Sequence, residues 1–485
     1  MTPETLGLLG IAAGLALLIW LAYRGWSILL VAPAAALLAS AFAGQPLLAS
    51  WTQLFMGGAA GFVSQFFPIF LLGAVFGKLM DDSGSALAIA RTLTDRLGRE
   101  RAVLAVVLAC AMLTYGGVSL FVVAFVVVPV ADALFRQANI PHRLIPATVA
   151  LGAFTFTMTA MPGTPAIQNA IPMPYFGTTP FAAPGLGLIG AAIMLSFGLW
   201  WLSRVTRRAR LRGEGYGPTS TSAVGTGDQL ARERVTTTDT FDLAESTRGH
   251  QSEALPPFWL AVLPMLVVVG INMAMSLAVL PGLQNGYLAE RRWGATSLAA
   301  VGGIWAVATA LLTAILVLVN RRRLPALRKT INAGANASVL PSLNTASVVG
   351  FGAVIAALPA FALISAAFLA VGGGPLVSLA VATNVIAGIT GSAAGGLMIS
   401  LKALGGTYVA LAAQAGIDPE LMHRVAAIAA GGLSSLPHNG AVVTLLAISG
   451  ATHRGSYRDV AIVMLIGTLL ALGTIIVLGL TFGAF

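Results

Sequence analysis

Four short interruptions of long apolar stretches carry neutral polar residues. They are 114–119, 161–169, 391–396 and 434–440, named below the first tip, the first break, the second tip and the second break. Helix ends at such interruptions leave backbone N–H groups unpaired and carry a partial positive charge. Both properties favour an anion, and neutral side chains can bind the hydroxyls of a sugar acid or hydroxy acid. We therefore predict a site for a small organic anion where the four interruptions meet.

The candidate substrate-binding residues share a neutral hydrogen-bonding group or a place in one of these turns. They are Thr114, Tyr115, Gly116, Gly117, Ser119, Pro162, Gly163, Thr164, Gln168, Asn169, Gly391, Ser392, Ser434, Ser435 and Asn439. Any one of them can instead cap its own broken helix or join neighbouring helices, and the sequence leaves that alternative open.

A proton-coupling group is harder to find, because the Asp and Glu residues fall mostly in predicted loops. Only Asp132, Asp81 and Asp82 can lie within a span, and all three are near its cytoplasmic end. His438 is the only histidine inside an interruption, and the ordinary pKa of histidine is near neutrality. A proton can travel on His438 or with a weakly acidic substrate. Equally, a neutral His438 can fix its loop by a hydrogen bond.

The composition places these interruptions within a membrane. Of 485 residues, 57% are hydrophobic and 9% charged, whereas a soluble chain carries roughly a quarter charged residues. The apolar surface therefore needs membrane lipid to cover it. The formal charge of +10 comes largely from arginines in short loops between apolar runs, which is the positive-inside pattern and not a nucleic-acid site. The five histidines are scattered and there is one cysteine, so we predict no metal site, no bound cofactor and no enzyme activity.

Two apolar legs flank the first tip, within about 102–135, and arginines lie at both outer ends. Legs of this length cross roughly half to two-thirds of a hydrocarbon core of about 30 Å. A re-entrant hairpin that enters from the cytoplasm explains both features. A second hairpin is predicted at about 376–412. Broken helices are predicted at about 144–175 and 420–449, because their prolines remove backbone donors.

The order of these features repeats along the chain. Gly116 and Pro162 are 46 residues apart, as are Gly391 and Pro437. Each half contains five predicted transmembrane spans and one hairpin. Since five is odd, the second half starts on the opposite side, and such inverted repeats are typical of secondary transporters. We expect an all-α polytopic membrane protein with midplane helix breaks, divided into a first repeat at 1–203, a disordered cytoplasmic linker at 204–255 and a second repeat at 256–485.

Several stretches in both halves resemble the gluconate permease (GntP) family of the ion transporter superfamily. They are Gly77-Lys78-Leu79-Met80-Asp81-Asp82-Ser83-Gly84, Tyr115-Gly116-Gly117-Val118-Ser119-Leu120-Phe121, Met161-Pro162-Gly163-Thr164-Pro165, Gly391-Ser392-Ala393 and Leu436-Pro437-His438-Asn439-Gly440. The resemblance implies proton-coupled import of gluconate or related carboxylates across the bacterial inner membrane. It also implies an elevator-type carrier with two hairpins, and a homodimer.

The resemblance is imperfect at the two breaks. Gluconate-type members carry a His-Pro-Gly-Pro-Thr-like run where this chain has Met161-Pro162-Gly163-Thr164-Pro165, and their second break also differs. Both stretches look more like the branch described as 3-hydroxybutyrate permeases. The expected function is a proton-coupled symporter for gluconate or a short hydroxy-monocarboxylate. A sodium-coupled carboxylate carrier is the alternative, followed by an ion channel.

Overall fold

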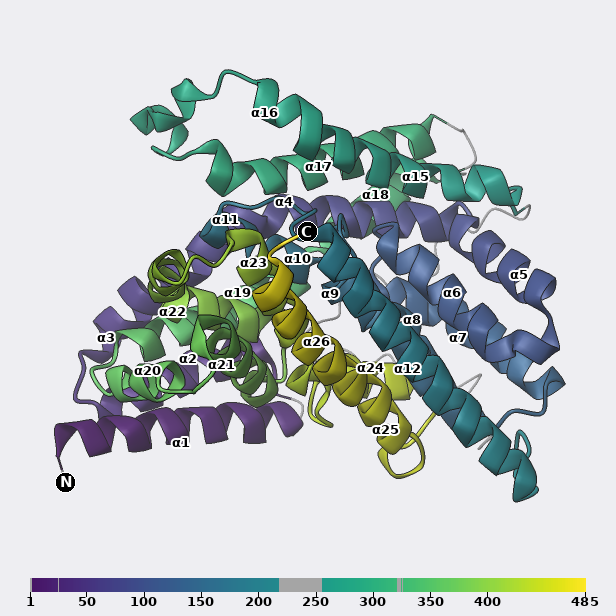
Figure 1. Cartoon of the computed structure of the whole chain (residues 1–485), viewed down its shortest axis with the longest axis horizontal. Helices are drawn as coiled ribbons and strands as arrows, with labels where there is room; N and C mark the ends of the chain where they lie inside the picture. The colour runs from purple at the N-terminus through teal and green to yellow at the C-terminus, as the bar shows by residue number, and fades with distance from the viewer. Residues whose placement is uncertain (1, 25, 218–254, 321–323, 325) are drawn as a thin grey trace.

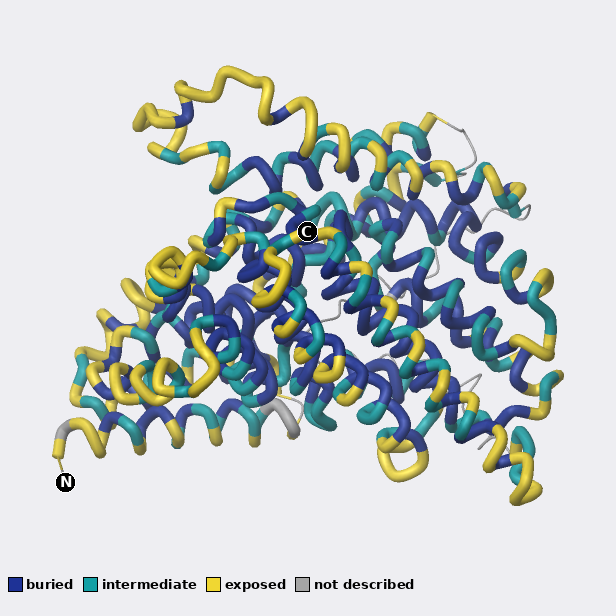
Figure 2. Tube along the Cα trace, in the orientation of Figure 1, coloured by how far each residue is buried: buried dark blue, intermediate teal, exposed yellow. Residues whose placement is uncertain are grey.

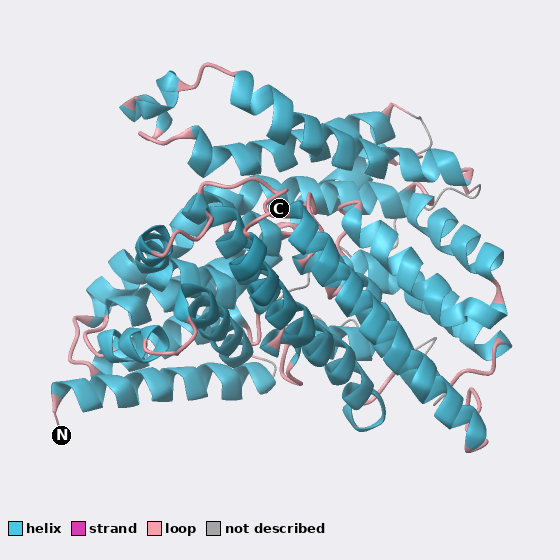
Figure 3. Cartoon of the chain, in the orientation of Figure 1, coloured by secondary structure: helices cyan, strands magenta, loops and turns pink. Residues whose placement is uncertain are grey.

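The computed structural model describes residues 2–24, 26–217, 255–320, 324 and 326–485. Every regular element within these ranges is a helix, as Figure 3 shows. Eight of the described helices are long and apolar enough to cross a membrane. The prediction of an all-helical polytopic membrane protein is confirmed at this level.

The first half of the chain runs from a long N-terminal helix to a long helix that ends before the central linker. Its helices are α1 (Pro3–Tyr23), α2 (Ile28–Phe42), α3 (Leu47–Ala49), η1 (Ser50–Phe55), α4 (Met56–Asp82), α5 (Ser85–Leu97), η2 (Arg99–Arg101), α6 (Ala102–Tyr115), α7 (Leu120–Gln137), η3 (His142–Leu144), α8 (Ile145–Ala153), α9 (Phe156–Thr159), α10 (Ile167–Ala170), α11 (Met173–Phe176) and α12 (Pro184–Leu211).

The second half follows a similar order. Its helices are α15 (Phe258–Ala274), η4 (Met275–Val279), α16 (Leu280–Gly282), η5 (Gly286–Ala289), η6 (Arg291–Trp293), α17 (Leu298–Val319), α18 (Leu327–Ala337), α19 (Val339–Ala357), α20 (Phe361–Leu369), α21 (Gly374–Thr390), α22 (Ala393–Gln414), α23 (Pro419–Ala430), η7 (Leu433–Ser435), α24 (Gly440–Ile448), α25 (His453–Ala461), η8 (Ile462–Ile466) and α26 (Gly467–Phe482).

A framework of long helices lies along one side of the interrupted segments. The continuous 36-residue helix Leu47–Asp82 packs against α17, α18 and α19, and α2 packs on α19. In Figure 1, α4 runs between the α15–α17 pair and the rest of the molecule. At the crossing with α18, a Cβ on Gly334 would lie 2.7 Å from the Cα of Val75, so glycine allows the two backbones to approach.

The two helical hairpins, α6–α7 and α21–α22, lie toward opposite ends of α4 (Figure 1). Their legs are 14, 18, 17 and 22 residues long. The legs of the second hairpin pack tightly, because a Cβ on Gly396 would lie 2.2 Å from the Cα of Ala387. Each hairpin therefore brings its tip toward the middle of the molecule.

Large apolar side chains cover the outside of the helices. Figure 2 shows buried residues in the centre of the molecule and exposed residues along the outer helices. Among the exposed residues are Trp20, Leu30, Trp200, Trp259 and Leu266. Water would penalise this much apolar exposure, whereas lipid accommodates it.

One predicted boundary is wrong, and one apolar stretch is divided. In the stretch 339–369, α19 ends at Ala357 and α20 begins as a separate helix at Phe361. Pro359, between them, has no N–H to continue the first helix. The linker was expected from residue 204, but α12 continues to Leu211. Most of the predicted linker, 218–254, lies outside the described residues.

A cluster of hydrogen bonds, here called the α12 clamp, holds the segment that follows α12. It comprises Asp132, Arg143, Glu214 and Tyr216. Arg143 donates from Nε and Nη2 to the Glu214 carboxylate, at 2.6 and 3.0 Å. The Tyr216 hydroxyl donates to the Asp132 carboxylate on α7. Arg143 also donates to Asp459 on α25 at 2.8 Å, so the clamp joins α12, α7 and α25.

Candidate functional site

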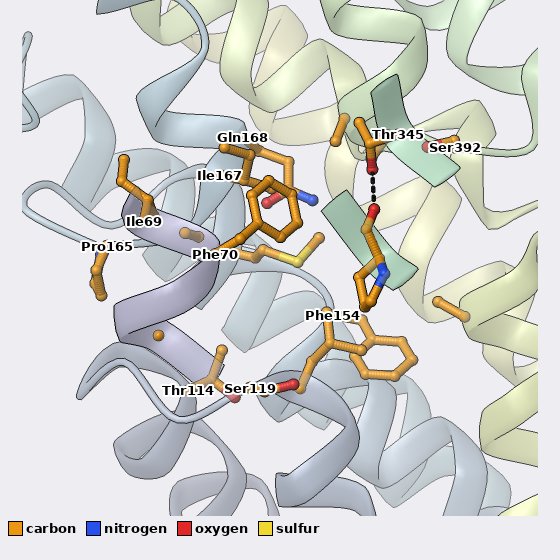
Figure 4. A pocket seen from close by; sticks show the side chains of 18 of the residues that line it. Ile69, Phe70, Thr114, Ser119, Phe154, Pro165, Ile167, Gln168, Thr345 and Ser392 are labelled. Atoms are coloured by element: carbon orange, nitrogen blue, oxygen red, sulfur yellow. Dashed lines mark hydrogen bonds between the residues drawn. The ribbon is translucent and has the colours of Figure 1, made fainter. Parts of the chain in front are cut away.

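The two tips and the two breaks border one cavity of about 240 Å³. Figure 4 shows side chains from the first half and the second half facing the same space. None of the described residues that line it is charged. Eight of the predicted site residues line the cavity, namely Thr114, Gly117, Ser119, Gln168, Gly391, Ser392, Ser434 and Asn439.

The first tip presents a hydroxyl group that has no partner. α6 ends at Tyr115, and Gly117 takes a positive φ of 95°, which a residue without a Cβ adopts readily. Thr114 lines the cavity and is 6% exposed, yet its Oγ1 makes no hydrogen bond to any described residue. A buried hydroxyl in this state costs about 1–3 kcal/mol. A polar ligand in the cavity would satisfy it.

The second tip is closed by its own side chain. Gly391 has a φ of 63°, and Ser392 follows it as the N-cap of α22, accepting a hydrogen bond from the Gly395 N–H at 3.1 Å. Ala393 and Ala394, the first residues of α22, also line the cavity. The N-terminus of a 22-residue helix therefore borders the same space as the N-terminus of α7 at Leu120.

In the first break, two neighbouring side chains have different surroundings. Gln168 lines the cavity. Asn169 is fully buried and donates from Nδ2 to the carbonyl oxygens of Thr164 and Pro180, at 3.1 and 3.0 Å. Thr164 accepts from the Ala166 N–H through its hydroxyl, at 3.4 Å. Asn169 and Thr164 thus shape the break, whereas Gln168 faces the space it encloses.

In the second break, Asn439 both caps a helix and contacts the second tip. Its Oδ1 accepts from the N–H groups of Ala441 and Val442 at the start of α24, at 2.8 and 3.3 Å. Its Nδ2 donates to the carbonyl oxygen of Gly391 at 2.7 Å. The neighbouring His438 lies outside the lining set, with Nε2 2.8 Å from the Gly388 carbonyl oxygen.

The remaining predicted residues support the cavity from behind. The Tyr115 hydroxyl donates to the carbonyl oxygen of Pro162 at 2.9 Å, joining the first tip to the first break. The Gly163 carbonyl accepts from Asn272 on α15 at 2.9 Å. Gly116 packs against the Met265 side chain, and Ser435 donates to the carbonyl oxygen of its own turn at Gly432. The structure brings none of these groups into the lining set.

Sequence reasoning missed one wall of the cavity. It consists of apolar and small residues from α4, with further residues from α8, α9 and the α18–α19 segment. They are Ile69, Phe70, Gly73, Ala74, Phe154, Met158, Ser338, Pro341 and Thr345. Figure 4 shows Phe70 beside Ile167 and Gln168. α4 continues through Pro68, which directly precedes Ile69, so the helix has no break that would mark these residues.

Sequence comparison relates the chain to known transporters. A family model described as GntP family permease matches residues 6–175. The uncharacterized transporter YxjC of Bacillus subtilis is 42% identical over 479 residues, covering 97% of this chain and 98% of that protein. The chain belongs to the GntP family of permeases. It is therefore a multi-pass membrane transporter and not an enzyme.

Two GntP-type relatives match over shorter stretches. A gluconate permease of Bacillus licheniformis is 34% identical over 120 residues, which are 24% of this chain and 25% of its own. The high-affinity gluconate transporter of Escherichia coli is 34% identical over 139 residues, 28% of this chain and 30% of its own. Among solved structures, the Alcanivorax borkumensis YdaH transporter superposes with a TM-score of 0.44 and 16% identity, over 90% of this chain and 89% of its own.

Proposed function

We propose that this permease is a proton-coupled symporter that imports a short hydroxy-monocarboxylate, with 3-hydroxybutyrate as the leading candidate. One observation carries the proposal: a single cavity joins both tips and both breaks, and its described lining combines neutral polar groups with apolar side chains and contains no charge.

Helix N-termini support an anionic substrate. The first residues of α7, α22 and α24 border the cavity, at Leu120, Ala393 and Ala441. Each helix N-terminus carries a partial positive charge and N–H groups with no intrahelical partner. With no lining carboxylate to repel it, a carboxylate would be attracted to this space.

The apolar wall supports a short substrate over a sugar acid. Ile69, Phe70 and Met158 line the cavity and would contact a methyl group favourably. Gluconate carries hydroxyls along its whole length, and these would be left unpaired against such a wall. The relatives described as gluconate transporters match only about a quarter of the chain, so their substrate does not transfer to this protein.

Coupling to protons rests on His438 and on the charge of the cavity. Sodium sites use several oxygen ligands, often with a carboxylate, and no carboxylate is present in the described lining. His438 sits beside the lining residue Asn439, and its Nε2 contacts the backbone of the second hairpin at Gly388. A change of protonation at His438 would alter that contact and so couple the proton to the position of the tip.

Inverted halves and elevator motion complete the proposal. The hairpins α6–α7 and α21–α22 lie toward opposite ends of α4 and meet at one cavity (Figure 1). We place Arg143 and the α12 clamp on the cytoplasmic side and the α21–α22 hairpin base on the outer side. In this arrangement, a moving unit carrying both tips would expose the substrate alternately to each side.

Uptake in proteoliposomes tests the proposal. The full chain is reconstituted, and uptake of labelled 3-hydroxybutyrate and gluconate is measured with an inward pH gradient, a sodium gradient or neither. We expect saturable accumulation of 3-hydroxybutyrate driven by the pH gradient and collapsed by a protonophore. Uptake that follows sodium and ignores pH would identify the sodium-coupled carrier. Flux that never exceeds equilibrium and does not saturate would identify a channel.

A His438→Ala variant separates substrate binding from coupling. Counterflow exchange of labelled for unlabelled 3-hydroxybutyrate needs no net proton movement, whereas accumulation does. We expect the variant to retain exchange and to lose accumulation driven by the pH gradient. Full proton-driven accumulation by the variant would remove His438 from the coupling mechanism.

A further inference from the structure

A fully buried arginine lies next to the first break. Arg424 on α23 has 0% exposure and is the largest fully buried side chain described in the protein. It lies in the middle of α23, directly after His423 and one turn after Glu420. Burying a guanidinium group inside a membrane protein is costly, so such residues usually have a function.

All the partners of Arg424 are neutral. Its Nε and Nη2 donate to the carbonyl oxygen of Ala182, at 3.1 and 2.6 Å. Its Nη1 donates to the Asn169 Oδ1 at 3.2 Å and to the Thr159 carbonyl oxygen at 3.5 Å. Within the described ranges, the guanidinium forms no ion pair. Among the described residues, its hydrogen-bond partners are therefore neutral, and the negative charge of Glu420 acts on it without forming an ion pair.

The groups around Arg424 compensate its charge only in part. The Asn169 amide is oriented by the two carbonyl groups that its Nδ2 contacts, so its Oδ1 faces His423 Nε2 at 3.1 Å. His423 then donates from Nε2, and its Nδ1 pairs with the Thr178 hydroxyl at 2.6 Å, so the imidazole supplies no negative charge. Glu420, one turn earlier on α23, accepts from the Ala183 N–H at 2.9 Å and does not reach the guanidinium.

The charge lies directly behind the cavity wall. Two of its partners, Thr159 and Asn169, follow Met158 and Gln168 in the chain, and both of these line the cavity. Charges act strongly over such short distances in a medium of low dielectric constant. An anion in the cavity would be the nearest mobile charge able to compensate the guanidinium.

We propose that Arg424 is the fixed positive charge that gives the cavity its affinity for carboxylates, acting through the wall without touching the substrate. This inference rests on the proposed function, since it assigns the residue a role in binding the same anion. It makes Arg424 a positioning and selectivity residue. The competing role is purely mechanical, with the guanidinium holding α23 to the segment 180–183 by its hydrogen bonds.

Two substitutions separate charge from hydrogen-bonding geometry. Arg424→Lys keeps the charge but cannot reproduce the forked contacts with Ala182 and Asn169. Arg424→Gln loses the charge but keeps an amide donor for the Ala182 carbonyl group. Arg204→Gln serves as a matched control, because it removes one arginine charge beside the exposed Trp200, where the guanidinium lies 5.8 Å from the ring centre.

The experiment measures binding of sodium 3-hydroxybutyrate and sodium gluconate to the purified full chain by isothermal titration calorimetry, after gel filtration in detergent confirms folding. We expect Arg424→Lys to stay within about threefold of the wild-type Kd and Arg424→Gln to raise it about tenfold or more. Arg204→Gln should leave the Kd unchanged. Equal losses in the Lys and Gln variants, or a larger loss in the Lys variant, would overturn the charge role in favour of the mechanical one.

The two hypotheses fail in different ways. If the wild-type protein binds neither carboxylate, the proposed function fails. If the wild-type protein binds one of them and Arg424→Gln binds it equally well, only the role of Arg424 fails. Should the Gln variant not fold, the folded Lys variant decides between the two roles. Its Kd for the same salts is then measured at rising ionic strength. Within the charge model its Kd stays near the wild-type value, and a tenfold loss contradicts that model.

Discussion

The two hairpin tips border the same cavity but are held differently. The second tip is tied to the second break, since Asn439 donates to Gly391 and His438 contacts Gly388. The first tip presents the Thr114 hydroxyl, which lacks a partner among the described residues. The hydrogen bonds of the second tip are therefore formed without a ligand, whereas the first tip would gain a hydrogen bond when a ligand binds. This difference suggests that substrate binding orders the first tip more than the second.

Breaking the tie at the second tip should have the largest effect. Asn439→Ala removes both the cap of α24, worth about 1 kcal/mol, and the bond to the Gly391 carbonyl, whose loss costs about 1–3 kcal/mol when buried. We expect uptake of 3-hydroxybutyrate to fall about thirtyfold or more. Asn439→Ser keeps a capping oxygen, adds no charge and is too short to reach the Gly391 carbonyl oxygen. If it transports like the wild-type protein, the tie to the second tip is unimportant.

The first tip should respond in the opposite way. Thr114→Val has nearly the same shape but removes the unpartnered hydroxyl, so the ligand-free protein should become slightly more stable. The Kd for 3-hydroxybutyrate should rise about tenfold, since one hydrogen bond to a charged group is lost. Thermal unfolding and calorimetry measure the two quantities. Thr148→Val, where the hydroxyl donates to Leu144 within α8, is the control and should lower stability without changing the Kd.

A smaller effect is expected where the first tip meets the first break. Tyr115→Phe removes the hydroxyl that donates to the Pro162 carbonyl group. A neutral hydrogen bond contributes about 1 kcal/mol, so the Kd should rise about fivefold. Hydrogen exchange at residues 114–119 should also become faster in the ligand-free variant. Unchanged exchange there would show that the bond does not restrain the tip.

The smallest effect is expected at the base of the first hairpin, in the α12 clamp. The hydrogen bond from Arg143 lowers the pKa of Glu214. The clamp therefore stabilises the protein fully at pH values above the ordinary pKa of a glutamate side chain. Its contribution is lost as the pH falls through the lowered pKa that Glu214 has in the folded protein. Between pH 7 and pH 3.5, the Tm of the wild-type protein should fall slightly more than the Tm of Glu214→Gln. The difference should be small because water screens this partly exposed ion pair. Glu100→Gln, at an exposed site, should behave like the wild-type protein; equal falls in all three would exclude the clamp.

The sequence located the interruptions because each contains proline or glycine within an apolar run. Pro162 and Pro437 interrupt helices in the structure, and the neighbouring tips reach the same cavity. It could not show which side chain of a pair faces inward. Gln168 lines the cavity and Asn169 does not, because two carbonyl groups from other turns orient the Asn169 amide.

Continuous helices hid the rest of the site. Phe70 faces the cavity from the middle of α4, and no local signal distinguishes it from a lipid-facing or core phenylalanine. Arg424 was hidden for another reason. Its hydrogen-bond partners are backbone carbonyls and an amide oxygen from distant segments, and the sequence cannot show that these segments meet at α23.

The α12 clamp also has a consequence for how the chain is made. Asp132, Arg143, Glu214 and Tyr216 all belong to the first half, so a ribosome completes this set before it reaches α15. The nascent first half can thus secure the end of α12 on its own. Asp459 is synthesised late, and Arg143 can donate its remaining N–H group to Asp459 only after α25 has packed in place. This hydrogen bond would therefore form only once the second half has been inserted.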